Sequence, residues 1–397
     1  MHAPSAPTAI CLVTDRLSAG MLGAYGNCWV GTPSFDRLAS SALVADQMLL
    51  TSPLLGDFYR SIWQSDHEPE QSGHIAEIFS DRGSASLLIT DDAEVESIGN
   101  RFTRSCFIDP RSDNQSGDIQ RTETENFFSR AADILIGIED PALVWLHTRC
   151  LAETWDAPYA MREWYAAEDD PPPPTSQRAP HFYQSEKIDP DELLGWAQAY
   201  AAEVALWDQC LGGLLEIIDQ HPIFQHAVLL VMGCRGYPLG EHRSVGHGLA
   251  VDADGDLYRE LLQLPCLVRL PGGQHANREQ RLLQPDDLLK AVATWCARET
   301  QQKDPESDFF SSVPPRSTIL STHQNGNWSV RTPAWFLRAQ VGKKKTRELY
   351  FKPDDLWEVN DLAERCAEVV GAIEQLHEKV VSGQPAEPLD EILTKGL

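Results

Sequence analysis

The chain has 397 residues, of which 42% are hydrophobic and 23% are charged. These values are typical of a globular protein with a large core, and they exclude wholesale disorder and a fibrous chain. The formal net charge is −26, from 33 basic and 59 acidic residues. This charge argues against a general nucleic-acid or anionic-membrane binder, because like charges repel. A local basic pocket for a small anionic ligand remains compatible with it.

The sequence also predicts a cytoplasmic protein. Apolar runs such as Ala227–Met232 are far shorter than the roughly 20 residues of a membrane-spanning helix. Residues Met1–Pro4 lack the basic and apolar regions that open a signal peptide. The nine cysteines are scattered with no CxxC pair, which indicates reduced thiols rather than a disulfide framework or a zinc site.

Short apolar runs alternate with helical patterns along most of the chain. Ala9–Thr14 predicts a buried strand, and Thr32-Pro33 predicts the start of a helix because proline suits the first helical position. The other predicted strands are Ser86–Thr90, Ala142–His147, Ala227–Met232 and Leu264–Leu270, and the other predicted helices are Glu123–Gly137, Pro190–Gln220 and Leu288–Cys296. Buried strands that alternate with helices predict an α/β fold with a mostly parallel sheet between helices.

The last quarter of the sequence has a different pattern. Trp328–Arg331, Trp335–Gln340 and Glu348–Phe351 predict short antiparallel strands, with a basic turn at Lys343–Lys345. A final helix is expected at about Leu362–Val380. A polar segment near residue 300 divides the two patterns, so we predict an α/β domain over residues 1–305 and a smaller α+β subdomain over residues 306–397.

A series of short motifs resembles the sulfatases, a family of the alkaline-phosphatase superfamily. The motifs are Asp15-Arg16-Leu17, Leu22–Gly26, Thr32–Ala39, Thr51-Ser52-Pro53, Leu239–His242, Leu264–Pro271, Glu348-Leu349-Tyr350 and Asn360–Ala363. Each motif alone is weak, but together they follow the order of the family over nearly the whole chain. The resemblance implies an alkaline-phosphatase-like fold and relatedness to sulfuric ester hydrolases of the arylsulfatase type.

The resemblance also shows where the family's catalytic groups fall. Sulfatases convert a Cys or Ser to formylglycine, whose hydrate attacks sulfur. That position falls on Leu55, which cannot be converted, and the arginine of the same motif falls on Tyr59, next to Arg60. A family lysine falls on His247, and His147 is the nearest candidate for a family histidine. We therefore expect no retained catalytic residue of the formylglycine reaction.

The family's divalent metal, usually calcium, is held by carboxylates at strand ends. Its four ligand positions fall on Asp15, Arg16, Cys234 and Arg235. Arginine remains charged at any cellular pH, so two arginines would repel a divalent cation. We predict no bound metal, and we expect Asp15 to pair with Arg16 or Arg235 instead, since a guanidinium matches a carboxylate well.

Three hypotheses of function remain open. The first is a non-catalytic pseudoenzyme that binds a small anion or sulfate ester in a cleft lined by Arg16, Arg60, His147, Arg235 and His247. The second is an active hydrolase of sulfate or phosphate esters, with zinc held by Asp15, His147, Cys234 and His247. The third is a structural or partner-binding protein with a collapsed cleft. The sequence does not specify the ligand or the oligomeric state.

Overall fold

The computed structural model describes most of the chain. The described ranges are residues 6–64, 73–110, 119–183, 189–246, 257–272, 276–297, 309–341, 346–352, 354–383 and 393–394. Three sequence predictions fall outside these ranges, namely those on His247, on the Lys343–Lys345 turn and on the polar segment at residues 298–308.

A mixed sheet of nine strands forms the centre of the molecule, in the order β11-β2-β10-β7-β1-β5-β3-β4, with β9 paired to β2. The strands are β1 (Ala9–Thr14), β2 (Leu43–Leu49), β3 (Ala85–Thr90), β4 (Arg104–Phe107), β5 (Ala142–Thr148), β7 (Val228–Gly233), β9 (Gln263–Leu264), β10 (Cys266–Arg269) and β11 (Asn277–Leu283). Only β10 and β9 run antiparallel to their neighbours, so the predicted mostly parallel sheet is confirmed.

Three strands of the central sheet were not predicted from the sequence. Strands β11 and β4 lie at the two edges of the sheet, where only one side of the strand needs a partner and polar residues are tolerated. Their sequences, NREQRLL and RSCF, accordingly lack a continuous apolar run. Strand β2 contains Asp46 and Gln47 in its middle, so its sequence lacks the continuous apolar run that indicates a buried strand.

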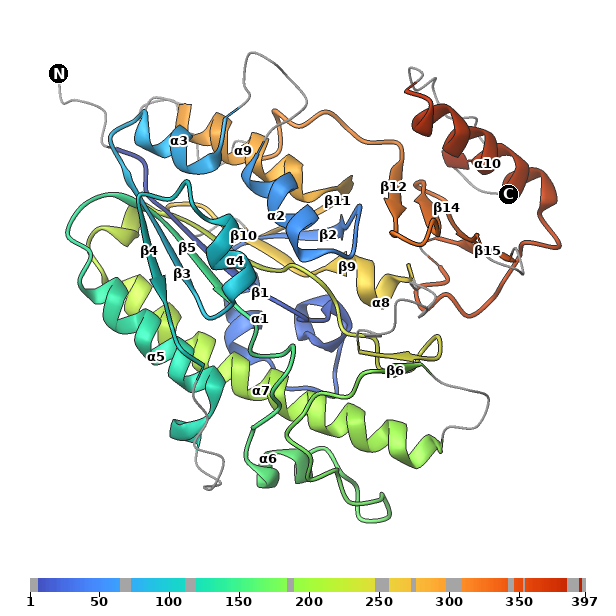
Figure 1. Ribbon diagram of the computed structural model, residues 1–397, viewed down its shortest axis with the longest axis horizontal. Helices are drawn as coiled ribbons and strands as arrows, with labels where there is room; N and C mark the ends of the chain where they lie inside the picture. The colour runs from blue at the N-terminus through green and yellow to red at the C-terminus, as the bar shows by residue number, and fades with distance from the viewer. Residues whose placement is uncertain are drawn as a thin grey trace.

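Helices cover both faces of the sheet (Figure 1). Helices α1 (Pro33–Ala39), α5 (Glu123–Ile136) and α7 (Pro190–Gln220) pack on one face, and α2 (Leu55–Trp63), α3 (Ile75–Ser80) and α9 (Pro285–Ala297) pack on the other. Strand β1 shows why both faces are needed, because its alternate side chains enter the two opposite cores. The shorter helices are α4 (Ala93–Ile98), α6 (Tyr159–Glu163) and α8 (Arg259–Leu262).

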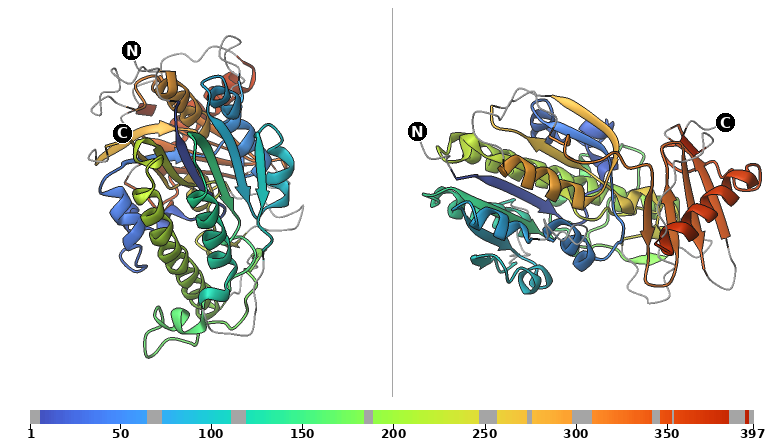
Figure 2. Two further views of the ribbon diagram at one scale, coloured as in Figure 1. Left: turned by 90° about the vertical axis from the view of Figure 1, so that its left-hand side faces the viewer. Right: turned by 90° about the horizontal axis from the view of Figure 1, so that it is seen from above.

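A second, antiparallel sheet lies at one end of the long axis (Figure 2). Its four strands are β12 (Ile319–Thr322), β13 (Trp328–Arg331), β14 (Trp335–Gln340) and β15 (Thr346–Phe351), followed by helix α10 (Ala367–Val381). The predicted antiparallel strands and terminal helix are confirmed, but the helix begins later than predicted. The backbone N–H of Leu362 is bonded to the carbonyl of Leu349 at 2.8 Å, which ties this segment to the sheet.

The two sheets have separate cores. Phe309, Phe310 and Val313 pack with the α2 side of the central sheet, whereas Val330, Leu337 and Ile373 pack within the smaller subdomain. The described chain therefore passes from one core to the other between Val313 and Ile319, and the division at residues 305 and 306 stays a prediction. Among the described residues no helix combines the length and the apolar character needed to cross a bilayer.

Candidate functional site

The sheet brings four strand ends together at one edge. Thr14 of β1 pairs with Thr148 of β5 on one side and with Gly233 of β7 on the other, and His147 pairs with Thr90 of β3. The residues that follow these strands therefore meet at the carboxyl edge, where ligands of α/β sheets ordinarily bind. Asp15 begins this cluster, and its backbone N–H is bonded to the carbonyl of Thr148 at 2.8 Å.

Asp15 and Arg235 form a two-point ion pair at this edge. Nε of Arg235 donates to Oδ1 of Asp15 at 2.8 Å, and Nη2 donates to Oδ2 at 2.5 Å. The two side chains are 1% and 14% exposed. Burial alone would raise the pKa of Asp15, but the charge and hydrogen bonds of Arg235 outweigh it and hold that pKa well below its usual range. Both carboxylate oxygens are thus engaged by one guanidinium.

Arg16 takes a different position beside the same carboxylate. Its φ of 65° lies in the left-handed region, which is uncommon for a residue with a side chain. The hydroxyl of Tyr200 donates to the Arg16 carbonyl and accepts from the backbone N–H of Ser18 at 3.0 Å, which holds this turn. The guanidinium donates to the carbonyl of Gly236 at 3.3 Å, and burial lowers its pKa to about 10. Arg235, rather than Arg16, is the partner of Asp15.

Cys234 is a protonated thiol in this structure. It is fully buried, and its Sγ lies 3.3 Å from Oδ1 of Asp15, to which it donates. Burial, together with the charge of Asp15, raises the pKa of this thiol well above its usual range. A thiol of this kind is a poor nucleophile and a poor metal ligand, since both roles need the thiolate.

Helix α2 carries Leu55, which the sequence resemblance predicts to stand at the family's nucleophile position. Leu55 is the first residue of this helix and is 3% exposed, within the apolar core of that face. Tyr59 lies on the same buried side. Arg60 points away, with a side chain that is 61% exposed and paired with Asp57 at 2.6 Å. The structure therefore does not bring Arg60 into the buried cluster, in contrast to the sequence prediction, because it lies on the solvent face of the helix.

His147 ends strand β5 inside the cluster. Its Nδ1 shares a 2.5 Å hydrogen bond with the hydroxyl of Tyr59, and both side chains are buried. Among the described residues, its buried Nε2 has no hydrogen-bond partner, and it lies 4.0 Å from Oδ2 of Asp92. Burial lowers the pKa of His147 to about 4, so the ring is neutral at physiological pH. The predicted site residue His247 lies outside the described residues.

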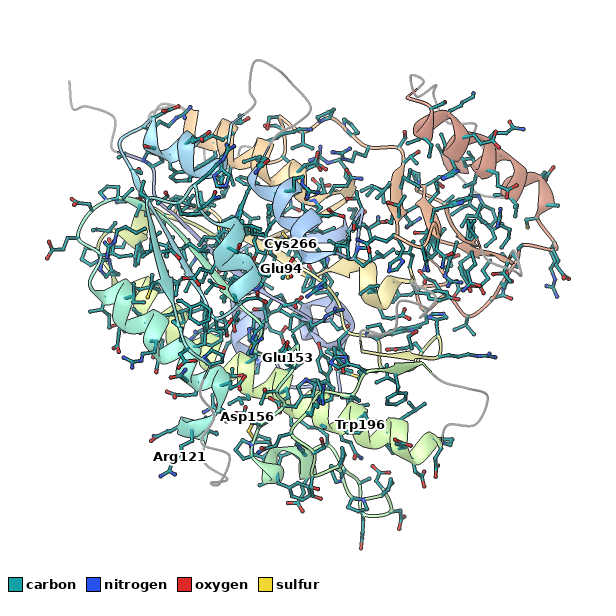
Figure 3. All side chains as sticks on the ribbon, viewed as in Figure 1. Glu94, Arg121, Glu153, Asp156, Trp196 and Cys266 are labelled. Atoms are coloured by element: carbon teal, nitrogen blue, oxygen red, sulfur yellow. The ribbon has the colours of Figure 1, made fainter. Side chains whose placement is uncertain are left out.

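Two acidic residues at this edge were missed by the sequence reasoning. Asp91 and Asp92 directly follow β3, and carboxylates after a buried strand were the signal available in the sequence. Asp91 accepts from the hydroxyl of Thr148 at 2.8 Å and from the backbone of Arg149 at 2.9 Å, and burial raises its pKa to about 7. Asp92 caps helix α4, and Figure 3 labels Glu94 in the first turn of that helix. The negative charge of Glu94 also favours the charged form of Arg235.

The residues at the family's metal position do not fit a calcium ion. Calcium takes six to eight oxygen ligands, usually including several carboxylates. Here Asp15 supplies the one carboxylate of the four ligand positions, and both of its oxygens accept from Arg235. The guanidiniums of Arg16 and Arg235 repel a cation, and Cys234 offers a neutral thiol. No step of a reaction can be derived through a metal at this set of donors.

The loop with Glu241 and His242 connects the two parts of the molecule. His242 shares a 2.8 Å hydrogen bond with Glu260 through Nδ1, and its Nε2 lies 3.0 Å from the carbonyl of Glu358. The ring also stacks on Tyr258, with the centroids 3.7 Å apart. Both ring nitrogens are therefore engaged in hydrogen bonds. For this reason His242 offers no free nitrogen with which to bind a metal together with the nearby carboxylates of Glu260 and Glu358. These contacts order the loop against the segments that carry Tyr258 and Glu358.

We expect the stability of the protein to depend on pH through His242. Burial opposes the charged ring, but the hydrogen bond and charge of Glu260 outweigh it and raise the pKa of His242 to about 9. The pKa of an unfolded histidine is about 6.5. The stability that the charged His242 contributes to the fold is therefore complete below about pH 6.5 and is lost as the pH rises through about 9. Thermal unfolding should show a smaller loss of stability between pH 6.5 and 9.5 for His242→Gln than for the wild type. His226→Gln, which changes an exposed histidine, should behave as the wild type, and equal pH slopes for all three proteins would contradict the assignment.

Comparison with known families identifies the family of the chain. The family model described as Sulfatase matches residues 7–297, which is most of the chain. The chain belongs to the sulfatase family. Human steryl-sulfatase is 39% identical over 72 residues, which are 18% of this chain and 12% of that protein. The chain thus aligns with only a small part of this curated relative, and the likeness is local.

Solved structures extend the likeness of this sulfatase-family chain to its whole fold. The protein BT4656, in complex with its substrate D-glucosamine-2-N,6-O-disulfate, superposes with a TM-score of 0.72 at 13% identity, covering 94% of this chain and 97% of that one. BT1596, a 2-O GAG sulfatase, gives 0.69 at 15% identity, with 95% and 92% covered. The phosphonate monoester hydrolase of Agrobacterium radiobacter gives 0.69 at 13% identity, with 95% of each chain covered. At these identities the neighbours establish the alkaline-phosphatase-like fold, including its C-terminal sheet.

Proposed function

We propose that this protein is a non-hydrolytic member of the sulfatase family that binds an anionic group, such as a sulfate ester or another oxyanion, at the carboxyl edge of β1, β5 and β7. The two-point bond between Arg235 and Asp15 carries this proposal. The guanidinium of Arg235 is a fixed cation that binds the carboxylate of Asp15, which in the family would bind a metal. The positive charge at this edge is then supplied by a side chain of the protein itself.

Two guanidiniums at this edge support binding of an anion. Arg16 and Arg235 are positive, Asp15 is negative, and His147 and Cys234 are neutral. The carboxylates of Asp92 and Glu94 lie nearby and offset the remaining positive charge, so the support comes from directed hydrogen bonds rather than from a net positive field. Arginine binds sulfate and phosphate oxygens with directed, charge-assisted hydrogen bonds.

The groups described at this edge include no usable nucleophile, which supports the non-hydrolytic part of the proposal. Leu55 has a hydrocarbon side chain and is packed into the core. The neighbouring thiol of Cys234 is protonated and donates to Asp15. His147, which could act as a base, has its Nδ1 bonded to Tyr59 and its Nε2 buried. Without an attacking group, the site can bind an ester but cannot form a covalent intermediate.

The second candidate is a hydrolase with a zinc ion held by Asp15, His147 and Cys234. The clustering of these three side chains at one sheet edge is the observation in its favour. Zinc would have to displace Arg235 from Asp15 and remove the proton of Cys234, both of which oppose binding. Metal analysis of the purified protein separates the candidates, because stoichiometric zinc is expected only for the hydrolase.

We expect purified protein to leave 4-nitrophenyl sulfate unhydrolysed in the presence of calcium, while the same compound raises the melting temperature. Arg16→Gln should reduce this thermal shift, because it removes one of the two cations. Arg60→Gln is the matched control, since it removes an equal charge from the exposed side of α2. Turnover that is abolished by Asp15→Asn would overturn the non-hydrolytic proposal. A thermal shift that is absent, or is the same in both arginine variants, would overturn the anion site and favour a collapsed cleft.

A further inference from the structure

A cavity of about 330 Å³ lies between the central sheet and the C-terminal sheet. Its walls come from segments far apart in the sequence, including Leu49 of β2, Gln280 of β11, Arg331 of β13 and Phe336 of β14. Asp15, Arg16, His147, Cys234 and Arg235 do not line it, so it is separate from the site at the strand ends. Its volume is within the range of small-molecule sites.

The charges on the wall of this cavity are unbalanced. Two acidic residues line it, and each is already matched to a cation. Asp46 pairs with Arg278, and the carboxylate of Glu358 accepts from Nζ of Lys352 at 2.9 Å. The other oxygen of Glu358 accepts from the backbone N–H of Arg259 at 3.0 Å. Two guanidiniums, those of Arg259 and Arg331, remain without a carboxylate partner among the described residues.

Arg331 is a buried cation whose hydrogen-bond partners in the described part of the chain are all neutral groups. The residue is 9% exposed. Its Nη1 donates to the carbonyls of Thr332, Pro333 and Trp335, and its Nη2 donates to the side-chain oxygen of Gln47 at 2.8 Å. Burial lowers its pKa to about 10, although the more distant charge of Glu358 acts in the opposite direction. A buried charge without a counter-ion is costly, so an anion in the cavity would relieve that cost.

Arg259 faces the cavity from helix α8 on the central-domain side. Its Nε donates to the side-chain oxygen of Gln263, and its guanidinium lies 5.1 Å from the ring centroid of Trp357. Burial lowers the pKa of Arg259 as well, despite the acidic residues nearby. Among the described residues, the side chain of Arg259 makes hydrogen bonds only through Nε and contacts a ring face, so its terminal nitrogens can donate to a ligand.

The rest of the wall is largely apolar. Leu49, Leu262, Phe336 and Leu356 all line the cavity. We propose that this cavity binds a small organic molecule with an apolar, ring-like body and a single anionic group, with the anion against Arg259 and Arg331 and the body against these apolar side chains. A small inorganic anion would leave the apolar wall uncovered. A neutral ligand would leave both guanidiniums without a counter-ion.

Two dyes of nearly the same shape test the proposal with the full-length protein. 8-Anilinonaphthalene-1-sulfonate carries one anionic group on an aromatic body, and N-phenyl-1-naphthylamine is its uncharged counterpart. We expect the sulfonate to bind saturably, with an affinity at least about tenfold higher than that for the neutral dye. Arg259→Gln and Arg331→Gln should each weaken binding of the sulfonate by about tenfold and leave the neutral dye unchanged.

Controls separate a specific site from general dye binding. Arg82→Gln removes the same charge from an exposed arginine after helix α3 and should leave both affinities unchanged. Leu49→Trp fills the apolar wall and should weaken both dyes. Equal affinity of the wild type for the two dyes would overturn the proposal. Unchanged sulfonate binding in Arg259→Gln would also overturn it, even if Arg331→Gln failed to fold.

Discussion

Replacing Arg235 by methionine is expected to destabilise the fold by about 3–5 kcal/mol at neutral pH, because it leaves the carboxylate of Asp15 buried without a counter-ion. Asp15 is 1% exposed, and both of its oxygens accept from Arg235. Arg16 and the thiol of Cys234 can supply only part of the lost stabilisation. Chemical denaturation measured by circular dichroism gives the free-energy difference directly.

The pH dependence of stability in Arg235→Met tests whether the buried charge of Asp15 causes the loss. Arg235 holds the pKa of Asp15 below its usual range. In the wild type the stability contributed by the Asp15–Arg235 pair is therefore present above about pH 3.9 and is lost as the pH falls below that value. In Arg235→Met, burial without the guanidinium should raise the pKa of Asp15 above its usual value. The variant should therefore become more stable as the pH falls, and its difference from the wild type should shrink.

Two further variants control this experiment. Asp15→Asn combined with Arg235→Met should recover much of the lost stability, because neither charge remains buried alone. Arg60→Met breaks the exposed pair with Asp57 and should cost less than about 1 kcal/mol. A loss in Arg235→Met that is as small as that in Arg60→Met would mean that the pair with Asp15 contributes little. That result would remove the observation on which the proposed function depends.

Gly236→Ala is expected to cause the second large loss, of about 3 kcal/mol or more, because the added methyl group has no room. A Cβ atom built on Gly236 would lie 1.9 Å from the carbonyl oxygen of Glu260, which belongs to the backbone of helix α8. The backbone N–H of Gly236 is also bonded to the carbonyl of Leu261 at 3.0 Å, so the two segments cannot separate without losing this bond. Thermal and chemical unfolding of the variant measure the cost.

Gly213→Ala is the matched control for this substitution. Gly213 lies within helix α7, and a Cβ atom there would meet nothing within 4 Å. Alanine has the higher helix propensity, so this variant should be more stable by about 0.5–1 kcal/mol. Because Arg16 also donates to the carbonyl of Gly236, Gly236→Ala should in addition reduce the thermal shift by 4-nitrophenyl sulfate. Wild-type stability of Gly236→Ala would show that α8 does not pack as described.

The predictability of the site differed from residue to residue. Asp15, Cys234 and Arg235 follow buried strands that the sequence indicates clearly, and parallel strands bring such residues to one edge. Arg60 was assigned to the same cluster, but one residue of helix is a turn of about 100°, which places Tyr59 inside and Arg60 in solvent. The carboxylates of Asp91 and Asp92 follow an equally clear strand and could have been included.

The cavity between the two sheets could not be predicted from the sequence. Its two unpaired guanidiniums, Arg259 and Arg331, are separated by 72 positions in the chain, and neither belongs to a recognisable motif. The packing of the C-terminal sheet against β2 and α8 decides which arginines form an ion pair with a carboxylate. Side-chain pairing of this kind is decided by distances of a few ångströms, which no local pattern encodes.

The sequence by itself determined the alternation of buried strands and helices and the antiparallel C-terminal strands, and it predicts arginine and leucine at positions where a sulfatase has ligands and a nucleophile. These features depend on residue type and spacing, which are local properties. Only the tertiary structure decided that Arg235, and not Arg16, binds both oxygens of Asp15, and that His147 is a neutral ring bonded to Tyr59. Both outcomes depend on burial and on contacts between distant segments, because the energy of a charged group is set by the atoms that surround it.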